Sequence, residues 1–117
     1  PTALEIAGVK RPEQVQFNSL LPLLSGDRKT THYSTVYGAY LGVQRSVTLD
    51  GKKLLLYPGV PVARLYDIDK DPHEMKDLAK DPNTLKFQKQ LFAKLLELQK
   101  ETGDTLDLTA KFQKLAQ

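Results

Sequence analysis

The sequence predicts an α+β fold, with a small antiparallel sheet of about four strands packed against a long C-terminal amphipathic helix. Strand-forming residues gather between positions 33 and 68, where Tyr, Thr and Val recur in short alternating runs. Asp50-Gly51 divides two of these runs, and this pair favours the tight turn of a β-hairpin. After the last run, leucines spaced three and four residues apart predict the helix.

The first 31 residues are predicted to be mostly irregular. Residues 2–7 fit the last turns of a helix that Gly8 ends, and they start as though the helix began before residue 1. Ser19 and Pro22 fit the cap and the first turn of a short helical turn ending at residue 24. The polar segment 26–31 is predicted to be a loop.

Four strands are predicted in the middle of the chain, at residues 33–41, 43–49, 52–57 and 62–68. Asp50-Gly51 joins the second strand to the third, because a type I′ turn needs a positive φ at both central residues. The segment 58–61, which holds two prolines, connects the third strand to the fourth.

Two helix starts follow the strands. Asp71 and Glu74 are predicted to form a capping box for a helix that ends near Ala79, with proline in the first helical position. Asp81-Pro82 repeats this start for a helix that ends near Thr102, before Gly103. Its apolar stripe comprises Leu85, Leu91, Phe92, Leu95, Leu96 and Leu98. The spacing of Leu108, Phe112 and Leu115 predicts a last short helix.

Composition and charge are those of one small soluble domain with a single core. The 17 Lys and Arg residues exceed the 14 Asp and Glu residues by a net charge of +3, which is too little to indicate a nucleic-acid partner. No apolar run approaches the length of a membrane span. The chain has no cysteine, which excludes disulfides and thiol chemistry and leaves the compartment open.

Arg45 is the residue that stands out on a strand. In the run 43–49 the odd positions are Val, Arg, Val and Leu, so period-two alternation places Arg45 on the buried face. A buried guanidinium requires an anionic partner or several carbonyl groups. We therefore expect an internal ion pair or a carbonyl clamp; the alternative is a contact with another part of a larger protein.

The other candidate residues have two interpretations each. Tyr33, Tyr37 and Tyr40 fit core or cross-strand packing, and alternatively the lining of a sugar or aryl site. His32 and His73 have no cluster of potential metal ligands near them in sequence, and His73 is expected to be exposed. The acidic run 67–74 lacks the glycine and the distal glutamate of an EF-hand loop, so no metal site is predicted.

Five segments in order resemble the C-terminal region of the sulfatases. They are residues 1–8 (Pro-Thr-Ala-Leu-Glu-Ile-Ala-Gly), 18–26 (Asn-Ser-Leu-Leu-Pro-Leu-Leu-Ser-Gly), 40–47 (Tyr-Leu-Gly-Val-Gln-Arg-Ser-Val), 53–58 (Lys-Leu-Leu-Leu-Tyr-Pro) and 65–79, where a Leu-Tyr-Asp-Ile strand runs into Asp-Pro-His-Glu. Each segment is weakly specific alone, and their shared order carries the resemblance. It implies the C-terminal subdomain of an alkaline-phosphatase-like sulfatase.

The resemblance assigns no catalytic residue to this chain. Sulfatases carry a Cys/Ser-x-Pro-x-Arg motif whose first residue becomes formylglycine, and they bind Ca²⁺ through Asp-Asp and Asp-Asn pairs; none of these patterns occurs here. The resemblance implies that a parent protein supplies both groups, so no catalytic residue, cofactor or metal ligand is expected in this chain. The candidates for the substrate-pocket rim or for domain docking are Arg45, Gln44, Tyr37, Tyr40 and His32.

The resemblance also predicts domain organisation and partners. Residues 1–26 would be the end of a catalytic-domain helix and a linker, and residues 27–117 the C-terminal subdomain. The partners would be the catalytic domain of the same protein and a sulfated small molecule or glycan, with no nucleic acid and no membrane. The family favours a periplasmic or secreted location. The alternative is a stand-alone binding module for an anionic glycan or a protein.

Overall fold

The computed structural model describes residues 1–27, 29 and 31–117, which form two compact units, Pro1–Ser34 and Thr35–Gln117. The predicted loop 26–31 includes Arg28 and Thr30, which lie outside the described residues.

The first unit contains two short helices and no buried residue among those described. Helix α1, Thr2–Ile6, is followed by Gly8 with a φ of 65°, as the sequence predicts. Helix α2, Leu21–Leu24, has Leu20 rather than Ser19 at its N-cap position. The Ser19 hydroxyl nevertheless accepts the Leu21 N–H at 3.1 Å, so it satisfies a free donor of the first turn.

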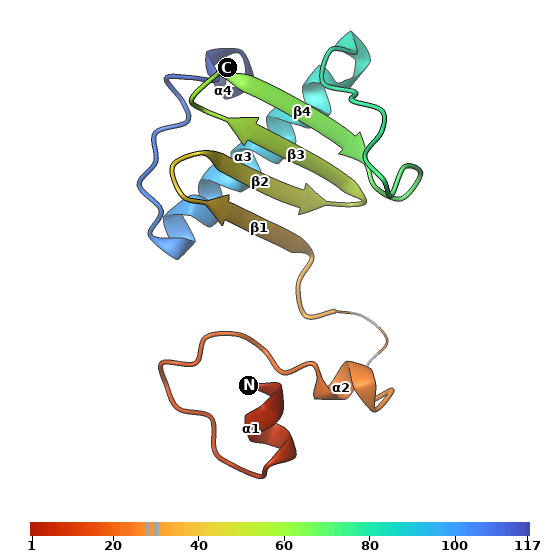
Figure 1. Ribbon diagram of the computed structural model, residues 1–117, viewed down its shortest axis with the longest axis vertical. Helices are drawn as coiled ribbons and strands as arrows, with labels where there is room; N and C mark the ends of the chain where they lie inside the picture. Colours follow the sequence, from red (N-terminus) through yellow and green to blue (C-terminus); the bar gives the residue numbers. More distant parts are fainter. Residues whose placement is uncertain (28, 30) are drawn as a thin grey trace. The chain divides into compact units, whose positions relative to one another are not determined.

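The second unit is built on a four-stranded antiparallel sheet in the order β1-β2-β3-β4 (Figure 1). The strands are β1 Thr35–Tyr40, β2 Gln44–Leu49, β3 Lys52–Tyr57 and β4 Val62–Asp67. The predicted fold class is confirmed, and each predicted strand is present, with ends that differ by no more than two residues.

The β2–β3 turn has the predicted geometry. Asp50 and Gly51 have φ values of 48° and 66°, which is the pair of left-handed conformations that a type I′ turn requires. This turn fixes the register in which Val47 faces Leu54 and Arg45 faces Leu56. A slip by one residue would move all of these side chains to the other face of the sheet.

The helix predicted for residues 71–79 does not form. Glu74 has a φ of 53°, outside the helical region, and its carboxylate pairs with Lys53 Nζ at 2.6 Å instead of returning to the cap. The Asp71 carboxylate accepts the Lys76 N–H at 2.7 Å and closes a turn. Local capping chemistry at Asp71 is therefore present, but the segment contacts β3 through Glu74 and does not continue as a helix.

The segment after β4 follows the outer edge of that strand. The Leu78 N–H donates to the Leu65 carbonyl at 2.8 Å, and the Leu65 N–H donates to the Asp77 carboxylate at 3.1 Å. Strand β1, at the opposite edge, pairs only with β2 among the described residues. The two edges of the sheet therefore differ, since β4 is bonded at its central residue Leu65 and β1 has no second strand among the described residues.

Helix α3, Leu85–Thr102, crosses one face of the sheet (Figure 1). A 3₁₀ turn, Pro82–Thr84, precedes it, and the Asp81 carboxylate caps that turn by accepting the Asn83 N–H at 2.9 Å. Gly103 ends the helix with a φ of 70°. The predicted helix is thus confirmed, with a tighter first turn.

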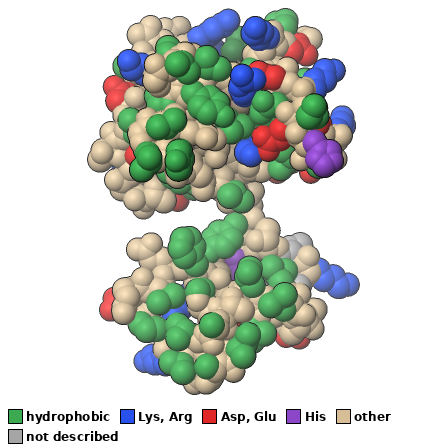
Figure 2. All heavy atoms as spheres, viewed as in Figure 1, with side chains coloured by type: hydrophobic (Ala, Val, Ile, Leu, Met, Phe, Trp, Pro, Cys, Tyr) green, Lys and Arg blue, Asp and Glu red, His purple; other side chains and the backbone are tan. Residues whose placement is uncertain are grey.

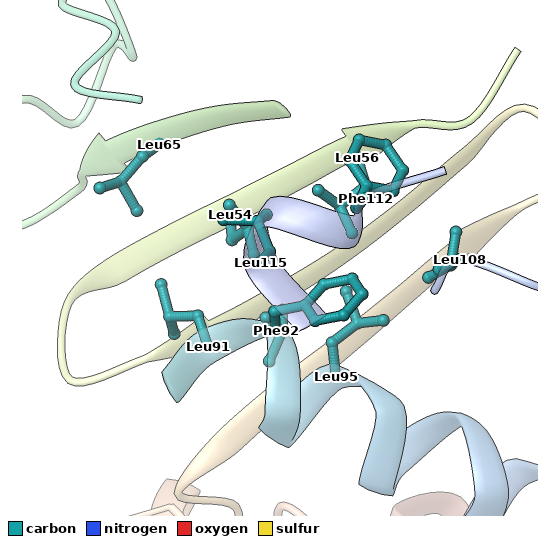
Figure 3. Packing of buried hydrophobic residues seen from close by; sticks show 10 residues of the cluster. Leu54, Leu56, Leu65, Leu91, Phe92, Leu95, Leu108, Phe112 and Leu115 are labelled. Atoms are coloured by element: carbon teal, nitrogen blue, oxygen red, sulfur yellow. The ribbon is translucent and has the colours of Figure 1, made fainter. Parts of the chain in front are cut away.

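The core lies between α3 and the sheet, where apolar side chains from both point toward one another (Figure 3). Leu108, Phe112 and Leu115 from the tail complete it, although helix α4, Gln113–Ala116, is shorter than predicted and includes only the last of them. The fully buried residues are Val47, Leu54, Leu56, Leu65, Leu91, Phe92, Leu95 and Leu108.

Candidate functional site

Four of the five candidate residues lie on β1 and β2. Tyr37 and Arg45 are in phase with the core and face α3. Tyr40 and Gln44 are cross-strand partners on the opposite face, which α3 leaves open. His32 is an exposed residue of the first unit.

Arg45 forms an internal ion pair with Asp104. Its side chain is only 7% exposed, and both Nε and Nη2 contact the carboxylate, with an Nη2–Oδ1 distance of 2.9 Å. This two-pronged geometry uses the planar fork of the guanidinium. The predicted buried phase and internal pairing of Arg45 are therefore confirmed.

Asp104 is the centre of a small polar network. Besides Arg45, its carboxylate accepts the Tyr37 hydroxyl, the Gln99 amide at 3.0 Å and the Leu106 N–H at 3.2 Å. The Arg45 guanidinium, followed in effect by these other donors, holds the pKa of Asp104 well below its usual range against the opposing effect of burial. Burial and then the bond to Asp104 raise the pKa of Tyr37 to about 12.

The same guanidinium fixes the β1–β2 turn. Arg45 Nη1 donates to the carbonyl oxygens of Leu41 and Gln44 at 2.5 and 2.8 Å. Leu41 has a φ of 47°, which is uncommon for a residue with a branched, bulky side chain. Arg45 therefore has both an anionic partner and carbonyl partners, and it joins the β1–β2 turn to the segment that follows α3.

Apolar side chains project outward from this fixed turn. The turn patch, as we name it, consists of Leu41 and Val43, which lie in the β1–β2 turn and are 73% and 52% exposed. Figure 2 shows hydrophobic side chains gathered on the sheet face turned toward the viewer, which is the face opposite α3.

The described residues include neither a cluster of metal ligands nor the nucleophile motif of the sulfatases. Among the residues that the structure describes, no group of three or more His, Asp or Glu side chains is placed to hold a metal ion. The chain has no cysteine, and no serine stands in the Cys/Ser-x-Pro-x-Arg pattern. The residues present therefore do not fit a formylglycine or a Ca²⁺ site.

Of the helices described, none combines the length and the apolar character needed to cross a lipid bilayer.

Sequence reasoning missed two parts of this site. Asp104 follows the C-terminal glycine of α3, and no local pattern connects it with Arg45, which lies 59 residues earlier. Gly38 in the middle of β1 was also passed over, although a glycine inside a strand is a recognised sign of close approach by a ligand or backbone.

The second unit is an α+β domain, with a four-stranded antiparallel sheet and one long helix. A model of the family described as "N-sulphoglucosamine sulphohydrolase, C-terminal" matches residues 1–101. The chain belongs to this sulfatase family and corresponds to its C-terminal part.

Individual relatives agree with this assignment. An N-acetylglucosamine-6-O-sulfatase from Bacteroides thetaiotaomicron is 34% identical, over 89% of this chain and 21% of its own length. A solved putative sulfatase from the same organism has a TM-score of 0.77 and 31% identity, over 89% of this chain and 24% of the other. Another solved structure shows a protein in complex with its substrate D-glucosamine-2-N,6-O-disulfate; it has a TM-score of 0.70 and 27% identity, over 90% of this chain and 24% of the other.

The chain therefore spans about a fifth to a quarter of the length of these relatives. Most of a sulfatase of their size lies outside the 117 residues.

Proposed function

We propose that this chain acts as the C-terminal subdomain of a longer sulfatase, supports the catalytic domain, and contributes to the rim of the substrate pocket. The turn patch carries this proposal. An apolar surface on a turn held by a buried Arg45–Asp104 pair is suited to a permanent contact, because little order must be gained on docking. Alone, the chain is expected to be catalytically inert.

The first unit supports the same proposal. Residues 1–26 are proposed to belong with the catalytic domain as the end of a helix and a linker, and residues 27–117 form the subdomain. No described residue before Thr35 is buried, so the apolar side chains of this unit have no core of their own. The large exposed ones are Ile6, Val9, Phe17, Leu20, Leu24 and Tyr33.

The chemistry is assigned to the remainder of the longer protein. In this proposal that part carries the formylglycine nucleophile and the Ca²⁺ ion, and the substrate is a sulfated glycan or a smaller sulfated sugar. The support is the names of the relatives, which include an N-acetylglucosamine-6-O-sulfatase, an ulvan-active sulfatase and a Δ4,5-hexuronate-2-O-sulfatase. One structural relative was solved with D-glucosamine-2-N,6-O-disulfate. In this chain Arg45 and Tyr37 position the turn, while Tyr40 and Gln44 face the proposed rim.

The test uses the coding sequence that continues upstream of Pro1, which is expected to encode Cys/Ser-x-Pro-x-Arg in the same reading frame. The encoded full-length protein should release sulfate from an aryl sulfate, whereas the 117-residue chain should not, with or without Ca²⁺. Leu41→Asp should lower the activity of the full-length protein at least about tenfold by weakening docking. Met75→Asp, at an 83% exposed position outside the turn patch, is the matched control.

Turnover by the isolated chain that survives repurification would contradict the proposal, and so would an equal loss in the Leu41→Asp and Met75→Asp proteins.

A second candidate function is a stand-alone module that binds an anionic glycan or protein. A hollow of about 590 Å³ favours it, since Lys80, Lys111 and Lys114 line its margin over an apolar floor that includes Phe112 and Leu115. The cations lie in the second half of the chain, although the excess of positive charge is in the first half. If the chain has this function, it should bind heparin. The triple variant Lys80→Gln/Lys111→Gln/Lys114→Gln should lose this binding, and the control variant Lys10→Gln/Lys76→Gln/Lys100→Gln should keep it.

A further inference from the structure

Gly38 leaves the backbone bare in the middle of β1, on the sheet face that α3 does not cover. Glycine is disfavoured inside a strand because it packs nothing and loses more conformational entropy than other residues. Its cross-strand partner is Ser46, and a Cβ at position 38 would come within 2.5 Å of the Ser46 hydroxyl oxygen. The glycine therefore leaves space beside the Ser46 hydroxyl, and any other side chain at position 38 would crowd that oxygen atom.

That space is a hollow of about 180 Å³, lined by Gly38, Ala39, Tyr40, Gln44 and Ser46. Tyr40 is 64% exposed and stands across from Gln44 at the margin of the hollow. The Gln44 amide and the Ser46 hydroxyl make no hydrogen bond with any other described residue, so their donors and acceptors are available to a ligand.

We propose that this hollow is a subsite for one uncharged pyranose ring of a glycan. The aromatic face of Tyr40 would cover the C–H face of the ring, and Gln44 and Ser46 would bond its hydroxyl groups. A hollow with an aromatic wall and a few neutral polar groups matches a sugar ring better than it matches a sulfate. This proposal rests on the proposed function, since it places a sugar next to the sulfated one along the substrate path.

The charge distribution determines which part of the glycan the hollow can take. None of its five lining residues is charged. The nearest guanidinium in sequence, that of Arg45, points to the other face and is neutralised by Asp104. The hollow therefore binds sugar hydroxyl groups through uncharged side chains, and the affinity should depend little on the salt concentration.

The Arg45 clamp gives the subsite its rigidity. It bonds the carbonyl oxygen of Leu41, which follows Tyr40, and the carbonyl oxygen of Gln44 itself. The spacing of Tyr40 and Gln44 is thereby set before a ligand arrives, which reduces the ordering cost of a weak, small ligand.

The test is an NMR titration of the isotope-labelled 117-residue chain with N-acetylglucosamine. We expect millimolar binding with shifts concentrated at residues 38–46, and an affinity that changes less than twofold between 20 mM and 500 mM NaCl. Tyr40→Ala should weaken binding at least about tenfold, and Gln44→Ala and Gly38→Ala at least about threefold. Val36→Ala is the matched control, since this exposed residue lies on the same strand and face but outside the hollow.

The proposal is overturned by an absence of shifts at residues 38–46 up to solubility, by equal weakening in the Val36→Ala protein, or by binding that is lost in salt. Gly38→Ala tests the space alone, because the obstructing atom belongs to the short Ser46 side chain, which can rotate. Amide spectra and melting temperatures establish that each variant folds.

This titration needs no catalytic domain, so its outcome is separate from the Leu41→Asp docking test. If the chain binds the sugar but the docking test fails, the proposed function is wrong and the subsite stands. If the docking test succeeds but no sugar binds, the subsite is wrong and the proposed function stands.

Discussion

Arg45 has the largest expected effect of any single charged residue on the sheet. Arg45→Ala would leave the Asp104 carboxylate partly buried without its main partner and free the Leu41 carbonyl. Breaking a buried pair in this way costs about 3–5 kcal/mol. Lys52→Ala removes a 3.2 Å pair with Asp67 whose lysine is 30% exposed, so it should cost less than about 1 kcal/mol. Urea unfolding midpoints measure both; equal midpoints would contradict the assigned role of Arg45.

Tyr37 makes the folding stability of the chain depend on pH in the alkaline range. Its pKa is raised to about 12 in the folded chain, from 10.0 for the free side chain. Between these two values the unfolded chain loses the proton first, so folding stability must fall as pH rises through this window. Tyr37→Phe should abolish that part of the fall, which unfolding curves between pH 9 and pH 12 would detect. Tyr40→Phe, on the open face, is the control, and an unchanged slope in Tyr37→Phe would refute the assignment.

At the scale of helices and strands, the elements set by residues close together in the sequence were predictable, and those set by distant contacts were not. The strands and the β2–β3 turn were predictable because alternation and Asp50-Gly51 act over a few residues. The helix expected at 71–79 does not form, and the segment instead bonds Lys53 through Glu74 and Leu65 through Leu78, contacts that local sequence does not reveal. The buried phase of Arg45 was predictable from strand alternation, whereas its partner Asp104 was not, since only the packing of α3 on the sheet brings them together.

The end of α3 offers a test of backbone conformation alone. Gly103 has a φ of 70° and nothing within 4 Å of where a Cβ would be. Gly103→Ala should therefore destabilise the fold by about 1–2 kcal/mol through the left-handed conformation and not through a clash. Gly59→Ala is the matched control, since Gly59 has equally open surroundings and no positive φ. Similar denaturation midpoints for the two variants would show that the glycine is not required at the helix end.

At the scale of the whole molecule, stability should be divided between the two units. No described residue of Pro1–Ser34 is buried, whereas Leu54, Leu56, Leu91 and Leu95 are fully buried in the second unit. Amides of residues 1–25 should exchange with solvent at least about a hundredfold faster than those of β3 and the middle of α3. Hydrogen exchange on a sample shown to be monomeric measures this. Strong protection of residues 1–25 in that sample would favour a self-contained module.

The unequal edges of the sheet limit how copies of this domain can aggregate. Asp77 and Leu78 bond the N–H and the carbonyl of Leu65 in the middle of β4, whereas β1 pairs only with β2 among the described residues. An incoming strand therefore meets a less obstructed edge at β1 than at β4. Two copies joined antiparallel through β1 would leave only their β4 edges for a third, and the bonds at Leu65 oppose strand-by-strand growth beyond a pair.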